Sequence, residues 1–295
     1  MPSKKELRRA WLFFVLTLAS VYFTYGWLWE EGSPFSDRGT MARSAVFSLA
    51  LMAILGAHEL AHYWVARHHG FALSLPYFIP FPLAFGTLGA VIRLRSLPKT
   101  RSGLLEMGAA GPLAGALLAF VCLLVGLEGT VAVEAPAVVD EGIDLLIFGN
   151  PEMMNLVGTW VTGEAPGRYD ILTPLALAGW VGCFLTALNL LPVGQLDGGH
   201  IVTALSPRWA PWISKASLLF LFVAGFLYWE GWAAWAVLLL VMGAWEGLDV
   251  PKESALTRRS KFVAVVTLVC FLLCFMPQPI QEETVATLPA ERVMP

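Results

Sequence analysis

Long apolar stretches alternate along the chain with short polar segments, and the apolar stretches dominate. A helix that crosses the roughly 30 Å hydrocarbon core of a bilayer needs about 17–25 mostly apolar residues. Stretches near this length occupy residues 10–29, 42–66, 104–127, 171–191, 211–229, 231–247 and 262–277, of which the last two are short. The pattern predicts an all-α, polytopic membrane protein with about six or seven transmembrane helices.

Composition supports a membrane protein. The 295 residues are 57% hydrophobic and only 14% charged, with a mean hydropathy of +0.67. Soluble domains usually carry about 25% charged residues. The four cysteines all fall inside apolar runs, so they indicate neither a disulfide framework nor a zinc knuckle.

Basic residues are distributed unevenly between the predicted helices. If the N-terminus is cytoplasmic, 15 of the 19 lysines and arginines fall in cytoplasmic segments, and only Arg38, Arg43, Arg168 and Arg292 fall outside. Cytoplasmic loops are enriched in Lys and Arg, so we predict a cytoplasmic N-terminus and a multi-pass protein of the cell membrane. The stretch 1–29 shows no small-residue cleavage site after its apolar run, which favours an uncleaved first helix over a signal peptide.

A polar signature interrupts the second predicted helix, in LGAHELAHYWVARHHG at residues 55–70. Ionisable side chains at bilayer depth cost about 2.5–3.5 kcal/mol each, so three of them there suggest a common function. His58 and His62 are four residues apart and share one helix face, where both imidazoles can reach one ion. Glu59 lies about 100° round the helix and can contact water at that ion. The pattern H-E-x-x-H predicts two zinc ligands and a general base.

A catalytic zinc ion needs a third protein ligand. The stretch TALNLLPVGQLDGGHIV, residues 186–202, breaks the fourth predicted helix on the same side of the membrane as the two histidines. Broken backbone at this depth is tolerated only where it is buried in protein or lines a wet cavity. Asp197 in this stretch is the candidate ligand, and the alternative is a helix N-cap. His200 could also ligate, although packing or exposure to water is the expectation.

These residues together carry a resemblance. HELAH in one span, followed by NLLPVGQLDGG in a later span, resembles the site-2 protease family of intramembrane zinc metalloproteases, and GAAGPLAG at 108–115 matches a third, looser element. The resemblance covers residues from about 42 to 202. It implies that His58, His62 and Asp197 bind one Zn²⁺ and that Glu59 is the catalytic acid/base. It also implies that Asn189 lies beside the site and hydrogen-bonds substrate or intermediate.

The segment 71–103 differs from the apolar spans. PYFIPFP cannot continue a helix and is expected to dip into the membrane interface, while GTLGAVIRLRS alternates apolar and polar positions as a short strand does. The resemblance implies a small re-entrant β element between the second and third spans. Such a strand could hold substrate in extended form; the alternative is an interfacial hairpin that only seals the site.

The organisation expected from these patterns has three parts. Residues 1–41 hold the first transmembrane helix and an outer loop, 42–202 form the catalytic core with an acidic outer loop, and 203–295 hold the C-terminal helices and a short tail. The resemblance implies intramembrane cleavage of a single-span membrane protein near the cytoplasmic side. Membrane lipid is the other expected partner, and nucleic acid is not expected. A zinc carrier or sensor and an inactive scaffold are the alternatives.

Overall fold

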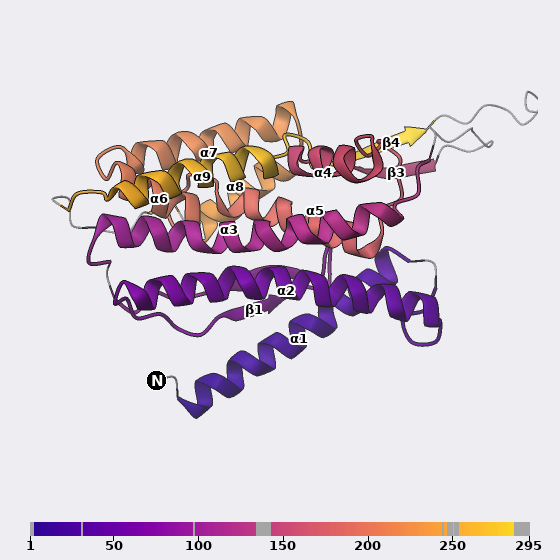
Figure 1. Ribbon diagram of the computed structural model, residues 1–295, viewed down its shortest axis with the longest axis horizontal. Helices are drawn as coiled ribbons and strands as arrows, with labels where there is room; N and C mark the ends of the chain where they lie inside the picture. Colours follow the sequence, from indigo (N-terminus) through magenta and orange to yellow (C-terminus); the bar gives the residue numbers. More distant parts are fainter. Residues whose placement is uncertain are drawn as a thin grey trace, which may run out of the picture.

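The computed structural model describes residues 3–30, 32–96, 98–133, 143–243, 245–246, 250 and 254–285. The fold is mostly helical, as predicted (Figure 1). The helices are α1 (Lys4–Leu28), α2 (Arg38–His68), α3 (Arg101–Gly126), α4 (Glu152–Thr162), α5 (Pro174–Asn189), α6 (Asp197–Leu205), α7 (Ala210–Leu227), α8 (Gly231–Val241) and α9 (Arg258–Cys274), with a 3₁₀ turn at Leu127–Gly129. The strands are β1 (Tyr77–Pro80), β2 (Thr87–Val91), β3 (Ile143–Phe148) and β4 (Ile280–Val285).

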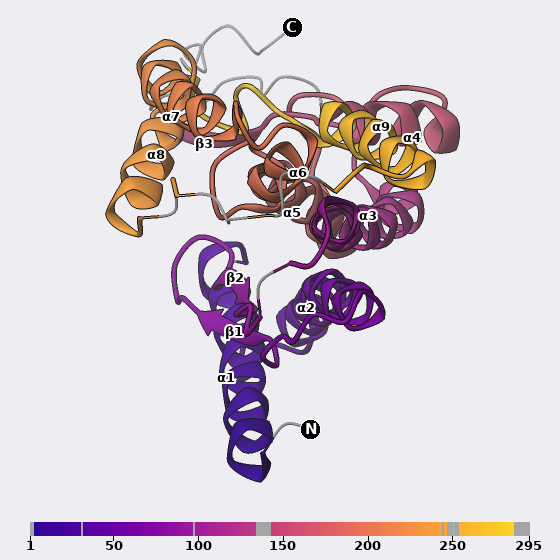
Figure 2. The same ribbon diagram turned by 90° about the vertical axis from the view of Figure 1, so that its left-hand side faces the viewer.

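Helix α3 is the centre of the assembly. It runs beside α2 along most of its length and also packs against α5, α6 and α9 (Figure 1). Seen end-on, α1, α2 and the β1–β2 hairpin lie on one side of α3, while α4–α9 lie on the other (Figure 2). Helix α1 diverges from α2 towards its own N-terminus.

Helices form at all seven predicted spans, but their lengths differ from the prediction. Within the described residues, four helices are long and apolar enough to cross a bilayer: α1, α2, α3 with its 3₁₀ extension, and α7. Helices α5 and α8 are shorter, with 16 and 11 residues. Helix α9 begins four residues earlier than expected because Thr257 caps its first turn by accepting a hydrogen bond from the Ser260 amide.

The predicted strand between the second and third spans is confirmed. Strand β2 pairs antiparallel with β1, with Tyr77 opposite Val91. The segment PYFIPFP therefore contributes a strand. Its prolines prevent a helix, and its backbone N–H and C=O groups are instead paired across the hairpin. Beyond Val91 the strand ends, and Leu94 makes only an isolated bridge to Leu73. The hairpin packs against α1, and an ion pair between Arg95 and Glu6 joins the two.

A second sheet was not predicted. Strand β3, in the expected loop 128–170, pairs antiparallel with β4, in the expected tail. The indole of Trp180 in α5 donates a 2.7 Å hydrogen bond to the Gly149 carbonyl just after β3. Residues 134–142 of the acidic loop lie outside the described residues.

Buried apolar side chains form two clusters. The larger surrounds α3, with Phe47, Leu104 and Trp180 fully buried. The smaller joins α7 and α8 to the connection between α5 and α6 through Leu191, Val193 and the fully buried Trp232. The α5–α6 connection is thereby fixed between two packed layers.

Candidate metal centre

Three side chains from two distant segments converge in the interior. The Nε2 atoms of His58 and His62 each lie 3.2 Å from Oδ2 of Asp197, and 3.1 Å from each other. These are the only three His, Cys, Asp or Glu residues in the described part of the chain that gather as a potential metal site. The third ligand predicted from the sequence therefore lies beside the two histidines.

The spacing of the three atoms fits a zinc ion. Ligands about 2.0–2.1 Å from a tetrahedral Zn²⁺ lie about 3.3 Å apart. The donor set, two imidazoles and one carboxylate, leaves a fourth position for water, as catalytic zinc sites require. Two nitrogen lone pairs and a carboxylate oxygen this close repel one another unless a cation or a proton lies between them.

Helix α2 presents both imidazoles on one face. His58 and His62 lie one turn apart, and both are buried. They precede the end of α2 at His68 by ten and six residues, or about 15 and 9 Å along the axis. The pair therefore lies well inside the helix and away from its ends.

The His62 ring is oriented by the backbone of α3. Its Nδ1–H group donates a 2.7 Å hydrogen bond to the carbonyl oxygen of Met107. This bond fixes the tautomer, so the Nε2 lone pair faces His58 and Asp197. Metal-ligating histidines usually have such a partner on the second ring nitrogen.

Glycines let α3 approach the site closely. A Cβ atom at position 111 would collide with the His62 ring. One at position 115 would lie 3.3 Å from His58 Nδ1, and one at position 108 would lie 3.1 Å from the Asp197 carbonyl oxygen. The face containing Gly108, Gly111 and Gly115 thus packs directly on the three predicted ligands, as small residues allow between membrane helices.

Asp197 is positioned by a sharp reversal between α5 and α6. Helix α5 ends at Asn189, and Asp197 is the first residue of α6. A Cβ atom at Gly198 or Gly199 would collide with backbone carbonyls of the preceding connection. Only glycines allow α6 to pack this tightly against the segment that leads into it.

Glu59 lies beside the three converging atoms. It is 6% exposed, and its carboxylate interacts electrostatically with His58, His62 and Asp197. It is the next residue after His58, about 100° round the helix, so its side chain leaves α2 in a different direction from the two imidazoles. This arrangement suits a base that contacts water next to the metal ligands.

The other sequence candidates stand apart from this group. Asn189 is half-buried, and no hydrogen bond joins it to the three ligands among the described residues, so its predicted role in substrate binding stays a prediction. His200 is also outside the group, and its Nδ1 atom is buried without a hydrogen bond partner.

Two contacts around the site carry no sequence signal. The Met107 group that binds His62 is a backbone carbonyl, which every residue has. The contact of Arg101 with α6 joins residues more than 100 positions apart, and no periodicity in either segment indicates it. Both follow from how the helices pack.

Comparison with known proteins agrees with the geometry. Residues 46–228 match peptidase family M50. Over 183 residues the chain is 36% identical to "Probable zinc metalloprotease EGY2, chloroplastic" from Oryza sativa subsp. indica, covering 60% of this chain and 32% of that protein. The Arabidopsis thaliana protein of the same name is 31% identical over 79% of this chain and 41% of its own length.

A third relative is "Probable zinc metalloprotease EGY1, chloroplastic" from Arabidopsis thaliana, 36% identical over 52% of this chain and 28% of its own length. The chain thus spans less than half the length of these relatives. No solved structure gives a significant match. The family match covers more than half of the chain and includes all three converging residues. The chain therefore belongs to peptidase family M50, the site-2 protease family, and its long apolar helices are those of a membrane protein.

Proposed function

We propose that the protein is an intramembrane metalloendopeptidase that uses one zinc ion to cleave the transmembrane segment of a membrane protein. One observation carries the proposal: His58, His62 and Asp197 converge to 3.1–3.2 Å inside the bundle. Two of them lie on α2, a helix long and apolar enough to span a bilayer. At about 9–15 Å from the end of α2, the ligands would lie between the lipid surface and the midplane of a 30 Å core.

The chain supplies three functions around the metal position. His58, His62 and Asp197 hold the ion. When bound, a zinc ion would act as a Lewis acid that lowers the pKa of water to about 7 and polarises a carbonyl oxygen. Glu59 takes a proton from the attacking water and donates it to the amine nitrogen when the carbon–nitrogen bond breaks. The Met107 carbonyl keeps His62 in the required tautomer throughout.

A transmembrane helix must unwind before its carbonyl groups are accessible. Within the described residues the β1–β2 sheet has two strands, so each strand has one edge without a strand partner. An extended substrate segment could add to such an edge through backbone hydrogen bonds. We propose that the hairpin holds the unwound substrate in this way, with Asn189 hydrogen-bonding the substrate nearby.

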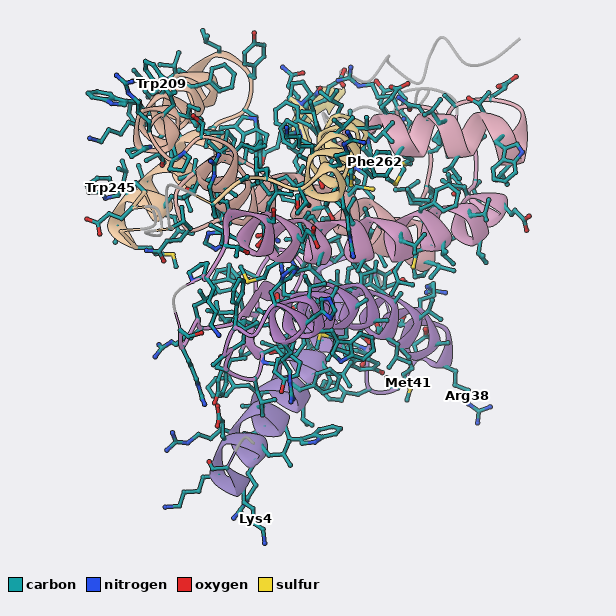
Figure 3. The ribbon with its side chains drawn as sticks, turned by 60° about the vertical axis from the view of Figure 1, so that its left-hand side comes forward. Lys4, Arg38, Met41, Trp209, Trp245 and Phe262 are labelled. Atoms are coloured by element: carbon teal, nitrogen blue, oxygen red, sulfur yellow. The ribbon has the colours of Figure 1, made fainter. Side chains whose placement is uncertain are left out.

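Charged and aromatic side chains support a proposal for the side of the membrane on which the site lies. Trp209 and Trp245 lie at one corner of the molecule (Figure 3), and the Lys215 ammonium lies 5.7 Å from the Trp245 ring centroid. Tryptophan and basic residues gather at membrane interfaces, basic ones on the cytoplasmic side. The α5–α6 connection is tied to this corner, since the Gly194 amide donates a 3.0 Å hydrogen bond to Ser214 Oγ. We therefore propose a cytoplasmic active site, a cytoplasmic N-terminus and a multi-pass protein of the cell membrane.

A single-span membrane protein is the proposed substrate class. Cleavage near the cytoplasmic side would release a soluble piece, which is the logic of regulated intramembrane proteolysis. The purified, zinc-loaded chain should be incubated in liposomes with a panel of single-span segments fused to soluble reporters. Mass spectrometry should locate the cut inside the membrane segment.

The control variant is Glu59→Gln, which keeps the side-chain shape but removes the base. Cleavage should fall by about 10²-fold or more while one zinc ion per chain remains bound. Cleavage at the unaltered rate would remove Glu59 from its role. Zinc flux across the liposomes without any cleavage would replace the protease proposal with a carrier.

A further inference from the structure

The guanidinium group of Arg101 binds the far end of the helix that begins with Asp197. Its Nε–H group donates a 2.7 Å hydrogen bond to the Ala204 carbonyl, and its Nη2–H group donates one of 2.7 Å to the Leu205 carbonyl. These are the last two residues of α6, whose carbonyl groups have no partner within the helix. A cation also interacts favourably with a helix C-terminus.

At the opposite end of helix α6, Asp197 meets His58 and His62. The N-cap, Leu196, forms no side-chain capping bond. The nine-residue helix is about 13 Å long, so it moves as a rigid unit and a shift at Leu205 is transmitted to Asp197. A change in the contact with Arg101 would therefore be transmitted to the Asp197 carboxylate.

Helix α3, which provides Arg101, also orients one of the two histidines of the site. Arg101 is the first residue of α3, and Met107, six residues later, accepts the hydrogen bond from His62. These two contacts are about 9 Å apart on one rigid helix. Helix α3 thus forms separate hydrogen bonds to the helix that carries the histidines and to the helix that carries the aspartate.

We propose that Arg101 is a positioning residue that holds Asp197 in ligand geometry, an inference that rests on the proposed metal site. The geometry requires arginine. Two adjacent N–H groups of one planar fork reach the carbonyls of two consecutive residues, whereas a lysine ammonium is a point donor on a flexible stem. Arg101 does not touch the metal position itself.

Zinc affinity of the full chain in detergent tests the proposal independently of catalysis. The metal is stripped with a chelator and returned in competition with a chromophoric chelator. Arg101→Gln should weaken zinc binding by about 10-fold or more, as loss of groups that orient metal ligands commonly does. Arg101→Lys should restore part of the affinity. The matched control is Arg208→Gln, an exposed arginine beside Trp209, which should leave affinity unchanged.

A double-mutant cycle separates positioning from general stability. Combined with Asp197→Ala, Arg101→Gln should cause no further loss of affinity, because the ligand it positions is already gone. Cobalt(II) bound in place of zinc should show a changed visible absorption spectrum in Arg101→Gln alone.

Unaltered zinc affinity and cobalt spectrum in a folded Arg101→Gln variant would overturn the inference, as would an equal loss in both backgrounds of the cycle. If the unsubstituted chain failed to bind zinc at all, the proposed function itself would fail, which is a distinguishable result.

Discussion

His69 and Glu106 form a 3.1 Å hydrogen bond between the residue that follows α2 and the second turn of α3. The other carboxylate oxygen of Glu106 accepts a 2.8 Å hydrogen bond from Ser260 Oγ in the first turn of α9. Glu106 is 8% exposed and Ser260 is fully buried. One carboxylate therefore joins three helices at the end of the bundle where α2 finishes and α3 and α9 begin.

Removal of this carboxylate should destabilise the fold. Glu106→Ala removes the acceptor of two hydrogen bonds, from His69 and from Ser260, and a hydrogen bond contributes about 0.5–1.5 kcal/mol to stability. We expect a lower thermal midpoint in detergent. Glu128→Ala, at an exposed position beyond the other end of α3, is the matched control and should leave the midpoint unchanged. Equal midpoints for the two variants would show that the carboxylate does not join the helices in solution.

Substitution of the predicted third ligand should remove the metal. Asp197→Ala leaves two imidazoles, and loss of the carboxylate should reduce zinc content to well below one ion per chain at micromolar free zinc. Elemental analysis of the purified variant measures this content directly. If Asp197→Ala retained a full equivalent of zinc at unaltered affinity, the aspartate would not be a ligand.

Addition of one methyl group on α3 should disturb the site. In Gly111→Ala the new Cβ atom collides with the His62 ring, so either α3 or the imidazole must move. We expect about 1–3 kcal/mol of destabilisation from overpacking, together with weaker zinc binding. Gly56→Ala in α2 is the control, since its Cβ atom meets nothing within 4 Å. That control should be neutral or slightly stabilising because alanine favours the helix more than glycine does.

The N-terminal cap of α2 should make stability depend on pH. The Asp37 carboxylate accepts a 2.6 Å hydrogen bond from the Thr40 amide, which lowers the pKa of Asp37 below its ordinary value of 3.8. Because the folded-state pKa is the lower one, the stabilisation is present above pH 3.8 and is lost as the pH falls through the folded-state value.

Asp37→Asn keeps a capping oxygen that does not titrate in this range. The stability advantage of the unsubstituted chain over Asp37→Asn should therefore shrink below about pH 4 in thermal unfolding experiments. A constant difference between pH 6 and pH 3 would contradict the assigned role of Asp37.

The sequence by itself determined the parts that depend on local pattern. Apolar runs of sufficient length located the helices because each helix satisfies its own backbone groups, whatever surrounds it. The four-residue spacing of His58 and His62 determined a shared face for the same reason. Alternation of apolar and polar side chains indicated strand β2. Asp197 was identified because a broken helix with ionisable groups in an apolar stretch requires buried partners.

Only the tertiary structure decided what joins distant segments. Three contacts depend on helix packing, which no local sequence period encodes. They join Asp197 to His58 and His62, the Met107 carbonyl to His62, and the Arg101 guanidinium to the end of α6. The pairing of β3 with β4 joins segments more than 130 residues apart, and each taken alone resembles a loop or a tail. Strands of this kind form because a partner edge is nearby in space, and chain position does not predict that partner.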